Sequence, residues 1–211
     1  MPQLVNKKTI AVDVDDVLAA NAKGFTDFSN ARWGTKLQPD DYTEHWAELW
    51  KVEHDELLKR RQIVIDEKVH YQHEVFEEAK AVLQGLKNRY KLAIVSSRSQ
   101  EIHKETFEWI DKEFPGVFEE IHFAKIYDDA GSSSREEVLK KLKQTKAEVL
   151  KEIDADYLID DQPKHCIAAA EAGITSLLFG DYKWNRDIKL RPNMIRTKTW
   201  QDVKEYFDAQ D

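Results

Sequence analysis

The chain has 211 residues, of which 41% are hydrophobic and 34% charged, and its net charge is −8 at pH 7. This length suits one domain with an insertion, or one large and one small domain, and the apolar content suffices for a buried core. No apolar run approaches the roughly 18 residues of a membrane span, and the acidic balance argues against a nucleic-acid backbone as the main partner.

Short apolar runs recur along the chain and predict the strands of a parallel sheet. They do not alternate with polar residues, which is typical of strands buried on both faces. The strong runs are residues 10–12, 92–95, 157–159 and 176–179, and a weaker one is residues 121–123. Apolar residues at helical spacing cover residues 74–87 and 100–114 between them. This alternation predicts an α/β fold with a Rossmann-like, three-layer parallel sheet.

The segment between the first two predicted strands is too long for a simple crossover. It runs from Val17 to Tyr90, whereas a complete strand–helix–strand unit takes about 30 residues. It is also rich in aromatic residues: Phe25, Phe28, Trp33, Trp46 and Trp50. We expect a core domain formed by residues 1–19 and 75–211, with a small helical insertion over residues 20–74.

Reactive polar residues follow three of the four strong runs. In chain order these are Asp13-Val14-Asp15-Asp16, then Ser96-Ser97-Arg98, then Asp160-Asp161. The carboxyl ends of parallel strands meet at one edge of a sheet, where ligands bind. Carboxylates gathered at that edge repel one another, and a divalent cation is the usual remedy. Their hard oxygen atoms favour Mg²⁺.

Such a site is suited to phosphoryl transfer. One carboxylate can attack phosphorus and form an acyl phosphate. A second carboxyl group then protonates the leaving oxygen and later activates water. Asp13 and Asp15, two residues apart at the end of a strand, fit these two roles, and Ser96 offers a hydroxyl group to the phosphoryl oxygens.

In this order the residues resemble a known superfamily. The run Asp13-Val14-Asp15-Asp16-Val17-Leu18, with Ser96, Lys146 and Asp160-Asp161 after it, is similar to the four motifs of the haloacid dehalogenase-like hydrolases. Members that cleave carbon–halogen bonds lack the second aspartate of the first motif, so Asp15 favours a phosphatase. The insertion resembles the helical C1 cap, and within the superfamily the chain most resembles the 5'(3')-deoxyribonucleotidase group.

The resemblance implies a role for each matching residue. Asp13 is expected to be the nucleophile and a magnesium ligand, and Asp15 the general acid/base, with its backbone carbonyl on the metal. Asp161 is expected to bind Mg²⁺ directly, with Asp160 in support. The phosphoryl group is expected to contact Ser96, Ser97 and Lys146, with Lys143 or Lys141 as alternatives to Lys146.

The resemblance is less informative about the substrate. In the deoxyribonucleotidase group, cap aromatics stack on a nucleobase, and Phe25 and Trp46 are the candidates here, although aromatics of a small helical cap also form its core. Arg98 is either a phosphate contact or part of a surface ion pair. The sequence departs from the group at Asp16, where glycine is usual, and at Gln162-Pro163.

These observations favour a magnesium-dependent phosphomonoester hydrolase with an aspartyl-phosphate intermediate, acting as a 5'-nucleotidase on (deoxy)nucleoside monophosphates. The alternatives are a phosphatase for another small phosphometabolite or for a polynucleotide end, and a non-catalytic protein that binds metal and phosphate. The resemblance also leaves a homodimer open.

Three further features concern compartment and other metals. Cys166 is the only cysteine, which excludes an internal disulfide and suits a reducing compartment. The first residues lack the apolar stretch and cleavage site of a secretory signal, so we expect a cytoplasmic protein. Among seven histidines the only tight spacing is His70-Tyr71-Gln72-His73, which we interpret as a surface or packing pair.

Overall fold

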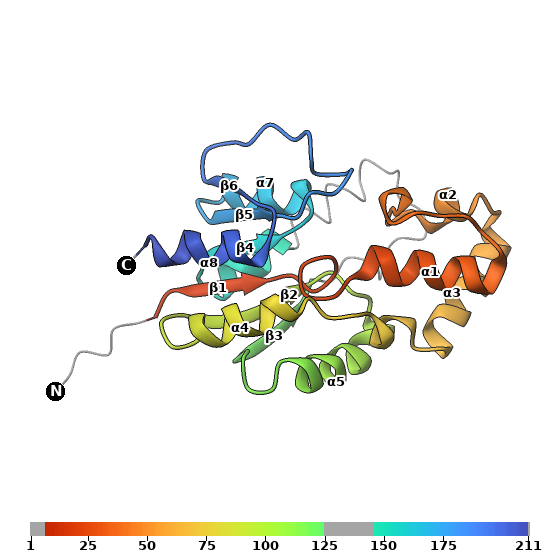
Figure 1. Cartoon of the computed structure of the whole chain (residues 1–211), viewed down its shortest axis with the longest axis horizontal. Helices are drawn as coiled ribbons and strands as arrows, with labels where there is room; N and C mark the ends of the chain where they lie inside the picture. Colours follow the sequence, from red (N-terminus) through yellow and green to blue (C-terminus); the bar gives the residue numbers. More distant parts are fainter. Residues whose placement is uncertain (1–6, 125–145, 211) are drawn as a thin grey trace.

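The computed structural model describes residues 7–124 and 146–210, and its centre is one parallel sheet (Figure 1). The strands lie in the order β3-β2-β1-β4-β5-β6. Their bounds are β1 (Thr9–Val12), β2 (Lys91–Ser96), β3 (Glu120–Phe123), β4 (Ala155–Asp160), β5 (Thr175–Phe179) and β6 (Met194–Thr197). The order reverses direction at β1, so the edge beyond β1, β2 and β4 is where an open parallel sheet binds ligands.

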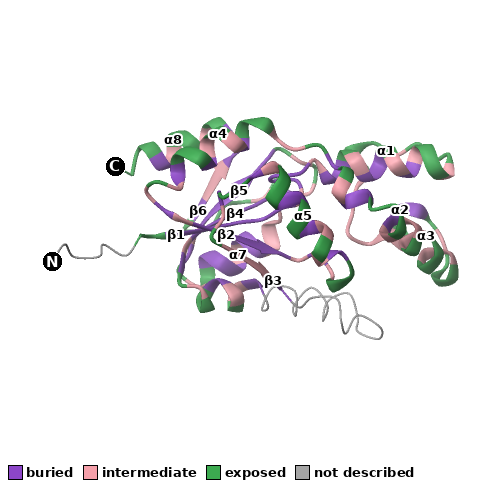
Figure 2. Ribbon diagram, turned by 90° about the horizontal axis from the view of Figure 1, so that it is seen from below, coloured by how far each residue is buried: buried purple, intermediate pink, exposed green. Residues whose placement is uncertain are grey.

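Helices cover both faces of this sheet (Figure 2). On one face, Ile10, Val12 and Leu92 pack with residues of α4 (Glu77–Leu86), α5 (His103–Glu113) and α8 (Trp200–Asp208). On the other face, Ala11 and Leu158 pack with α7 (Pro163–Glu171) and with the helical residues 146–152. The three-layer α/β fold predicted from the sequence is confirmed.

The strand β6 has no counterpart among the predicted runs. It reads Met-Ile-Arg-Thr and is only partly buried, because it lies at the edge of the sheet beside β5 alone. An edge strand needs no continuous apolar run, so the pattern that reveals central strands misses it. The weaker run at residues 121–123 is nevertheless a strand, β3.

The insertion folds into helices that gather beyond the carboxyl ends of the strands, at the opposite end of the molecule from both described termini (Figure 1). These elements are α1 (Asn21–Trp33), η1 (Pro39–Asp41), α2 (Trp46–Trp50), α3 (His54–Asp66) and η2 (Val69–Gln72). They enclose an apolar cluster of their own around Phe25, Trp50 and Val64. Outside the insertion, the short helix η3 (Gln100–Ile102) precedes α5. The division at residues 20 and 74 stays a prediction. Within the described residues no helix has the length and apolar character to cross a membrane.

Asp16 connects the end of β1 to this insertion. Its backbone φ of 57° lies in the left-handed region that favours glycine, which explains why glycine is usual at this position in the group that the sequence resembles. Its carboxylate accepts the N–H of Ala22, in the first turn of α1, at 2.9 and 3.2 Å. Aspartate therefore tolerates the strained backbone and also caps the helix that begins the insertion.

We expect Asp16→Ala to lower the free energy of unfolding by about 2 kcal/mol, because alanine loses the cap and keeps the left-handed backbone. Asp16→Asn retains an acceptor oxygen and tolerates this backbone, so it should remain within about 0.5 kcal/mol of the wild type. Urea unfolding of both variants measures the difference. Equal stability of the alanine and asparagine variants would contradict a capping role.

Candidate active site

The ends of β1 and β4 bring three aspartates together. The backbone N–H of Asp13 donates to the Ile159 carbonyl at 3.0 Å, which places Asp13 next to the end of β4. Carboxylate oxygens of Asp13, Asp160 and Asp161 all lie within 4.8 Å of one another, and all three residues are buried. Residues almost 150 positions apart therefore meet at the edge that the sequence predicted.

Lys146 is inserted among these carboxylates. Its Nζ lies 3.0 Å from Asp13 Oδ1 and 2.7 Å from Asp160 Oδ2, and the residue is only 1% exposed. Burial opposes its positive charge, but Asp13 and Asp160 overcome that effect and raise the pKa of Lys146 above its usual value. Lys146 is thus a permanently charged partner of Asp13, the candidate nucleophile. The alternatives Lys141 and Lys143 lie outside the described residues.

Asp160 already uses both of its carboxylate oxygens within the protein. Oδ2 contacts Lys146 and, at 3.1 Å, His165 Nδ1, while Oδ1 accepts the N–H of Gln162 at 2.8 Å. Burial would raise the pKa of Asp160, but the charges of Lys146 and His165 dominate and hold it well below its usual range. This arrangement suits a residue that positions Lys146 rather than a direct ligand of a metal.

Asp161 is oriented by two donors on one side of its carboxylate. The side-chain amide of Gln162 donates to Asp161 Oδ2 at 2.8 Å, and the Trp184 indole N–H donates to the same oxygen at 2.7 Å. In the described part of the chain no group donates to Asp161 Oδ1 or to Asp13 Oδ2. These two oxygens are the ones open to an ion or a substrate.

The residues fit a magnesium ion on electrostatic grounds. Burial raises the pKa values of Asp13 and Asp161, and neighbouring carboxylates raise them further, while Lys146 offsets part of the effect at Asp13. A divalent cation removes this repulsion and favours the ionised form. The donor set consists of hard carboxylate oxygens, which Mg²⁺ prefers.

Asp15 makes a multiple ion pair with Arg98. Arg98 Nη2 lies 2.7 Å from Asp15 Oδ1, and Nε lies 3.2 and 3.1 Å from the two oxygens. Burial favours the neutral acid, but the guanidinium dominates and lowers the pKa of Asp15 to about 2. Arg98 also donates to Thr106 and is 5% exposed. Of the two alternatives for Arg98, the surface ion pair is wrong, because Arg98 is a buried partner of the general acid/base candidate. Its contact with a phosphate stays a prediction.

The two serines after β2 lie in different surroundings. Ser96 is fully buried, and its hydroxyl oxygen accepts the N–H of Arg98 at 3.2 Å. Ser97 lines the cavity beside Asp13, and its hydroxyl has no partner within the described residues. The Ser97 hydroxyl is thus free to contact a ligand, and the predicted contacts of Ser96 and Ser97 with a phosphoryl group stay predictions.

A cavity of about 570 Å³ opens between the strand ends and the insertion. The strand ends contribute Asp13, Asp15, Ser97, Arg98 and Asp161, and the insertion contributes Tyr42, Trp46, His54, Leu57, Leu58, Arg61 and His70. Trp46 lies in this wall, and its contact with a base stays a prediction. The prediction for Phe25 is corrected, since Phe25 is fully buried and packs on Tyr42, Trp46 and Trp50.

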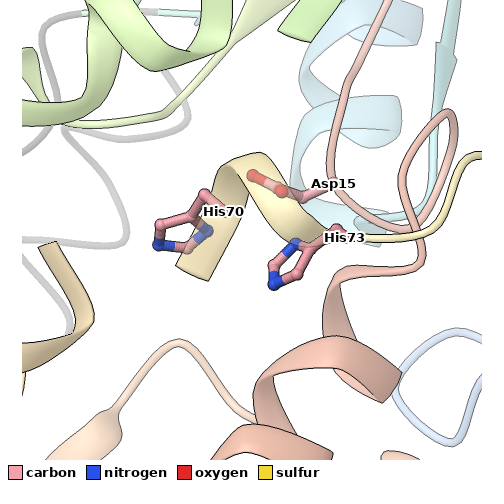
Figure 3. Close-up of side chains that lie close together, drawn as sticks. All are labelled: Asp15, His70 and His73. Carbon is pink, nitrogen blue, oxygen red and sulfur yellow. The ribbon is translucent and has the colours of Figure 1, made fainter. Parts of the chain in front are cut away.

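Several residues of the site could not be found from the sequence. Tyr42 and Arg61 follow no motif, and only the fold brings them to the cavity at the strand ends. Trp184 lies in the run from Phe179 to Asn185 that contributes to the resemblance, but its contact with Asp161 could not be read from the sequence. The spacing of His70 and His73 is visible in the sequence, but the surface alternative that it suggests is wrong. Figure 3 shows their rings beside Asp15, and both residues are buried.

Comparison with known sequences identifies one family. A family model described as 5' nucleotidase, deoxy (pyrimidine), cytosolic type C protein matches residues 7–128, more than half of the chain. The matched segment contains Asp13, Asp15, Ser96 and Arg98. No curated protein matches the chain.

Solved structures share the fold at low sequence identity. A haloacid dehalogenase-like hydrolase from Streptococcus pneumoniae has a TM-score of 0.67 and 15% identity, covering 95% of this chain and 98% of its own. A predicted phosphatase from Clostridium acetobutylicum has a TM-score of 0.67 and 13% identity, with coverages of 97% and 99%. The hydrolase YfnB from Bacillus subtilis, bound to magnesium, has a TM-score of 0.63 and 14% identity, with coverages of 96% and 99%.

Proposed function

Because the chain belongs to the 5' nucleotidase, deoxy (pyrimidine), cytosolic type C family, and is thus a haloacid dehalogenase-type phosphatase, we propose that it removes phosphate from (deoxy)nucleoside 5'-monophosphates. The observation that carries this proposal is the pairing of Asp13 with the buried Lys146 at the edge of a cavity of about 570 Å³. The family's description as cytosolic also supports the cytoplasmic location predicted from the sequence.

Asp13 is the proposed nucleophile. Lys146 binds Asp13 Oδ1 at 3.0 Å and leaves Oδ2 open. Attack of a carboxylate oxygen of Asp13 on phosphorus forms an acyl phosphate, and the phosphorus–oxygen bond to the nucleoside breaks. Water then attacks the same phosphorus and releases inorganic phosphate and free Asp13.

Asp15 is suited to proton transfer in both steps, but its ion pair with Arg98 keeps it ionised and so prevents it from donating a proton. With a pKa of about 2, Asp15 is ionised at neutral pH while it remains paired. The ionised form can take a proton from the attacking water. Donation of a proton to the leaving nucleoside oxygen requires Asp15 to hold that proton, and hence to separate from Arg98. Substrate binding is the event that can change this pairing.

Asp13 and Asp161 would hold a magnesium ion, with Asp160 behind them. When bound, the ion neutralises the charge of the phosphoryl group as it approaches the carboxylates. The protein's own contribution is to fix Asp161, through Gln162 and Trp184.

The walls of the cavity support a nucleoside as the leaving group. Trp46, Tyr42 and Leu57 offer aromatic and apolar surface opposite the strand ends. A base stacked on such a ring contributes about 1–3 kcal/mol. Residues 20–74 would then serve as a cap over the substrate. The net charge of −8 makes a polynucleotide end the less favourable substrate.

A panel of phosphate esters with and without Mg²⁺ tests the proposal. We expect hydrolysis of nucleoside 5'-monophosphates, loss of turnover with EDTA, and recovery when Mg²⁺ is restored. A clear preference for sugar phosphates would contradict the nucleotidase assignment but leave the phosphatase intact. Magnesium binding without turnover of any ester would contradict both.

We expect Trp184→Phe to weaken magnesium binding by about 10- to 100-fold, because it removes the donor that orients Asp161. The phenyl ring can still stack on Tyr182, whose ring lies 4.6 Å from that of Trp184. Calorimetric titration with Mg²⁺ measures the change. Trp33→Phe, in the apolar cluster of the insertion, is the control and should bind as the wild type does. An unchanged affinity in Trp184→Phe would show that this hydrogen bond does not position the ligand.

A further inference from the structure

Two buried histidines beside Asp15 have ring nitrogens without hydrogen-bond partners. His70 and His73 are 6% and 5% exposed. Neither ring nitrogen of His73 nor Nδ1 of His70 has a partner among the described residues. Leaving a buried polar atom unpaired costs roughly 1–3 kcal/mol, so several in one place indicate a bound water or ion.

These two imidazoles and the Asp15 carboxylate form a compact donor set (Figure 3). One nitrogen from each histidine and one oxygen from Asp15 all lie within 4.8 Å of one another. Ligand atoms about 2.1 Å from a tetrahedral zinc ion lie roughly 3.4 Å apart. Small rotations of the side chains would therefore bring all three atoms onto one ion, with a fourth position left open.

The chemistry of the donors selects the kind of metal. Burial, helped by the charge of Arg98, lowers the pKa of His70 to about 4 and that of His73 well below its usual value. Both rings are neutral at pH 7, which is the form that binds metals. Imidazole nitrogen suits zinc and similar transition metals, whereas magnesium prefers oxygen. Asp15 and His70 both line the cavity, so an ion can reach them from solvent.

We propose that Asp15, His70 and His73 form a second cation site, for zinc or a similar transition metal, and that the ion takes Asp15 from Arg98. Arg98 is the competitor, since its guanidinium contacts Asp15 at 2.7 to 3.2 Å. This site is separate in its donors from the cluster of Asp13, Asp160 and Asp161. The effect of zinc on activity rests on the proposed function. When Asp15 binds zinc it can no longer transfer protons, and the phosphatase is inhibited.

Calorimetric titration of the whole protein with Zn²⁺, at saturating Mg²⁺, tests the proposal. We expect one zinc per chain with micromolar or tighter affinity, and at least tenfold weaker binding in His70→Gln and in His73→Gln. His54→Gln is the matched control, because His54 lines the same cavity outside the donor set; it should keep the wild-type affinity. Co²⁺ in place of Zn²⁺ adds a visible absorption signature of tetrahedral coordination, which the His70 and His73 variants should lose.

Substitution of Arg98, which competes with the ion for Asp15, should change the zinc affinity in the opposite direction to substitution of a histidine ligand. Arg98→Met should bind Zn²⁺ at least tenfold more tightly than the wild type, and Zn²⁺ should raise its Tm more. Binding that survives both histidine substitutions but is lost in Asp161→Asn would overturn the proposal, since the zinc would then occupy the magnesium cluster. Absence of zinc binding would also overturn it and would assign the ring nitrogens to water, while hydrolysis of phosphate esters would remain as proposed.

Discussion

Asp13→Asn is expected to abolish phosphatase activity, lowering kcat by at least about 10⁴-fold. The asparagine amide is not a nucleophile at phosphorus, so the acyl phosphate cannot form. The remaining partners of residue 13 are little disturbed, because the backbone N–H still donates to the Ile159 carbonyl and the amide oxygen can still face Lys146. The measurement is kcat for an aryl phosphate at saturating Mg²⁺, with thermal unfolding to establish that the variant is folded.

A trapping experiment distinguishes the covalent mechanism from direct attack by water. Acid quenching during turnover of a phosphate-labelled ester should leave label on the wild-type protein and none on Asp13→Asn. Asp27→Asn is the matched control, since Asp27 is an exposed residue of α1, and it should retain both activity and label. Substantial turnover by Asp13→Asn in a folded preparation would refute the assignment of the nucleophile.

Lys146→Met is expected to lower the free energy of unfolding by about 3–5 kcal/mol, the usual cost of leaving a buried charge without its partner. Methionine preserves the length and apolar stem of the side chain, so the effect isolates the ammonium group. Asp13 and Asp160 would then face each other without the cation that lies 3.0 and 2.7 Å from them. Urea denaturation without added metal gives the loss of stability, and phosphatase assays should show a parallel loss of kcat.

Two comparisons make this prediction specific. Lys104→Met replaces a lysine whose side chain is 86% exposed and should change the stability by less than about 0.5 kcal/mol. The double variant Lys146→Met with Asp160→Asn removes one of the two uncompensated charges and should recover part of the lost stability. If Lys146→Met were as stable as Lys104→Met, the buried ion pairs would not be the contacts that hold this edge of the sheet together.

The fold was predictable because central parallel strands are buried on both faces. Residues 10–12, 92–95, 157–159 and 176–179 read as short, mainly apolar runs, and all lie in strands of one sheet. The edge strand β6 has no such apolar run in the sequence, since one of its sides faces no other strand. The resemblance to the haloacid dehalogenase-like hydrolases is confirmed by the family to which the chain belongs.

Part of the candidate site was equally readable, because its residues follow the strands directly. Asp13, Asp160 and Asp161 were predicted to meet at one edge, and the structure places their carboxylates together. Their roles in catalysis and metal binding stay a proposal. Where a side chain lies one or two residues beyond a strand, the direction of the strand decides its position, so local sequence is sufficient.

The remaining contacts depend on elements that are distant in sequence. The family, the sheet and the acidic residues at its edge can be read from the amino-acid sequence. The packing of separate elements is needed to show that Arg98 binds Asp15, that Phe25 is buried while Trp46 faces the cavity, and that His70 and His73 lie against Asp15. The physical reason is that a repeating apolar pattern specifies an element and its buried face. The partner of a single polar side chain is set by how separate elements pack, which no local spacing encodes.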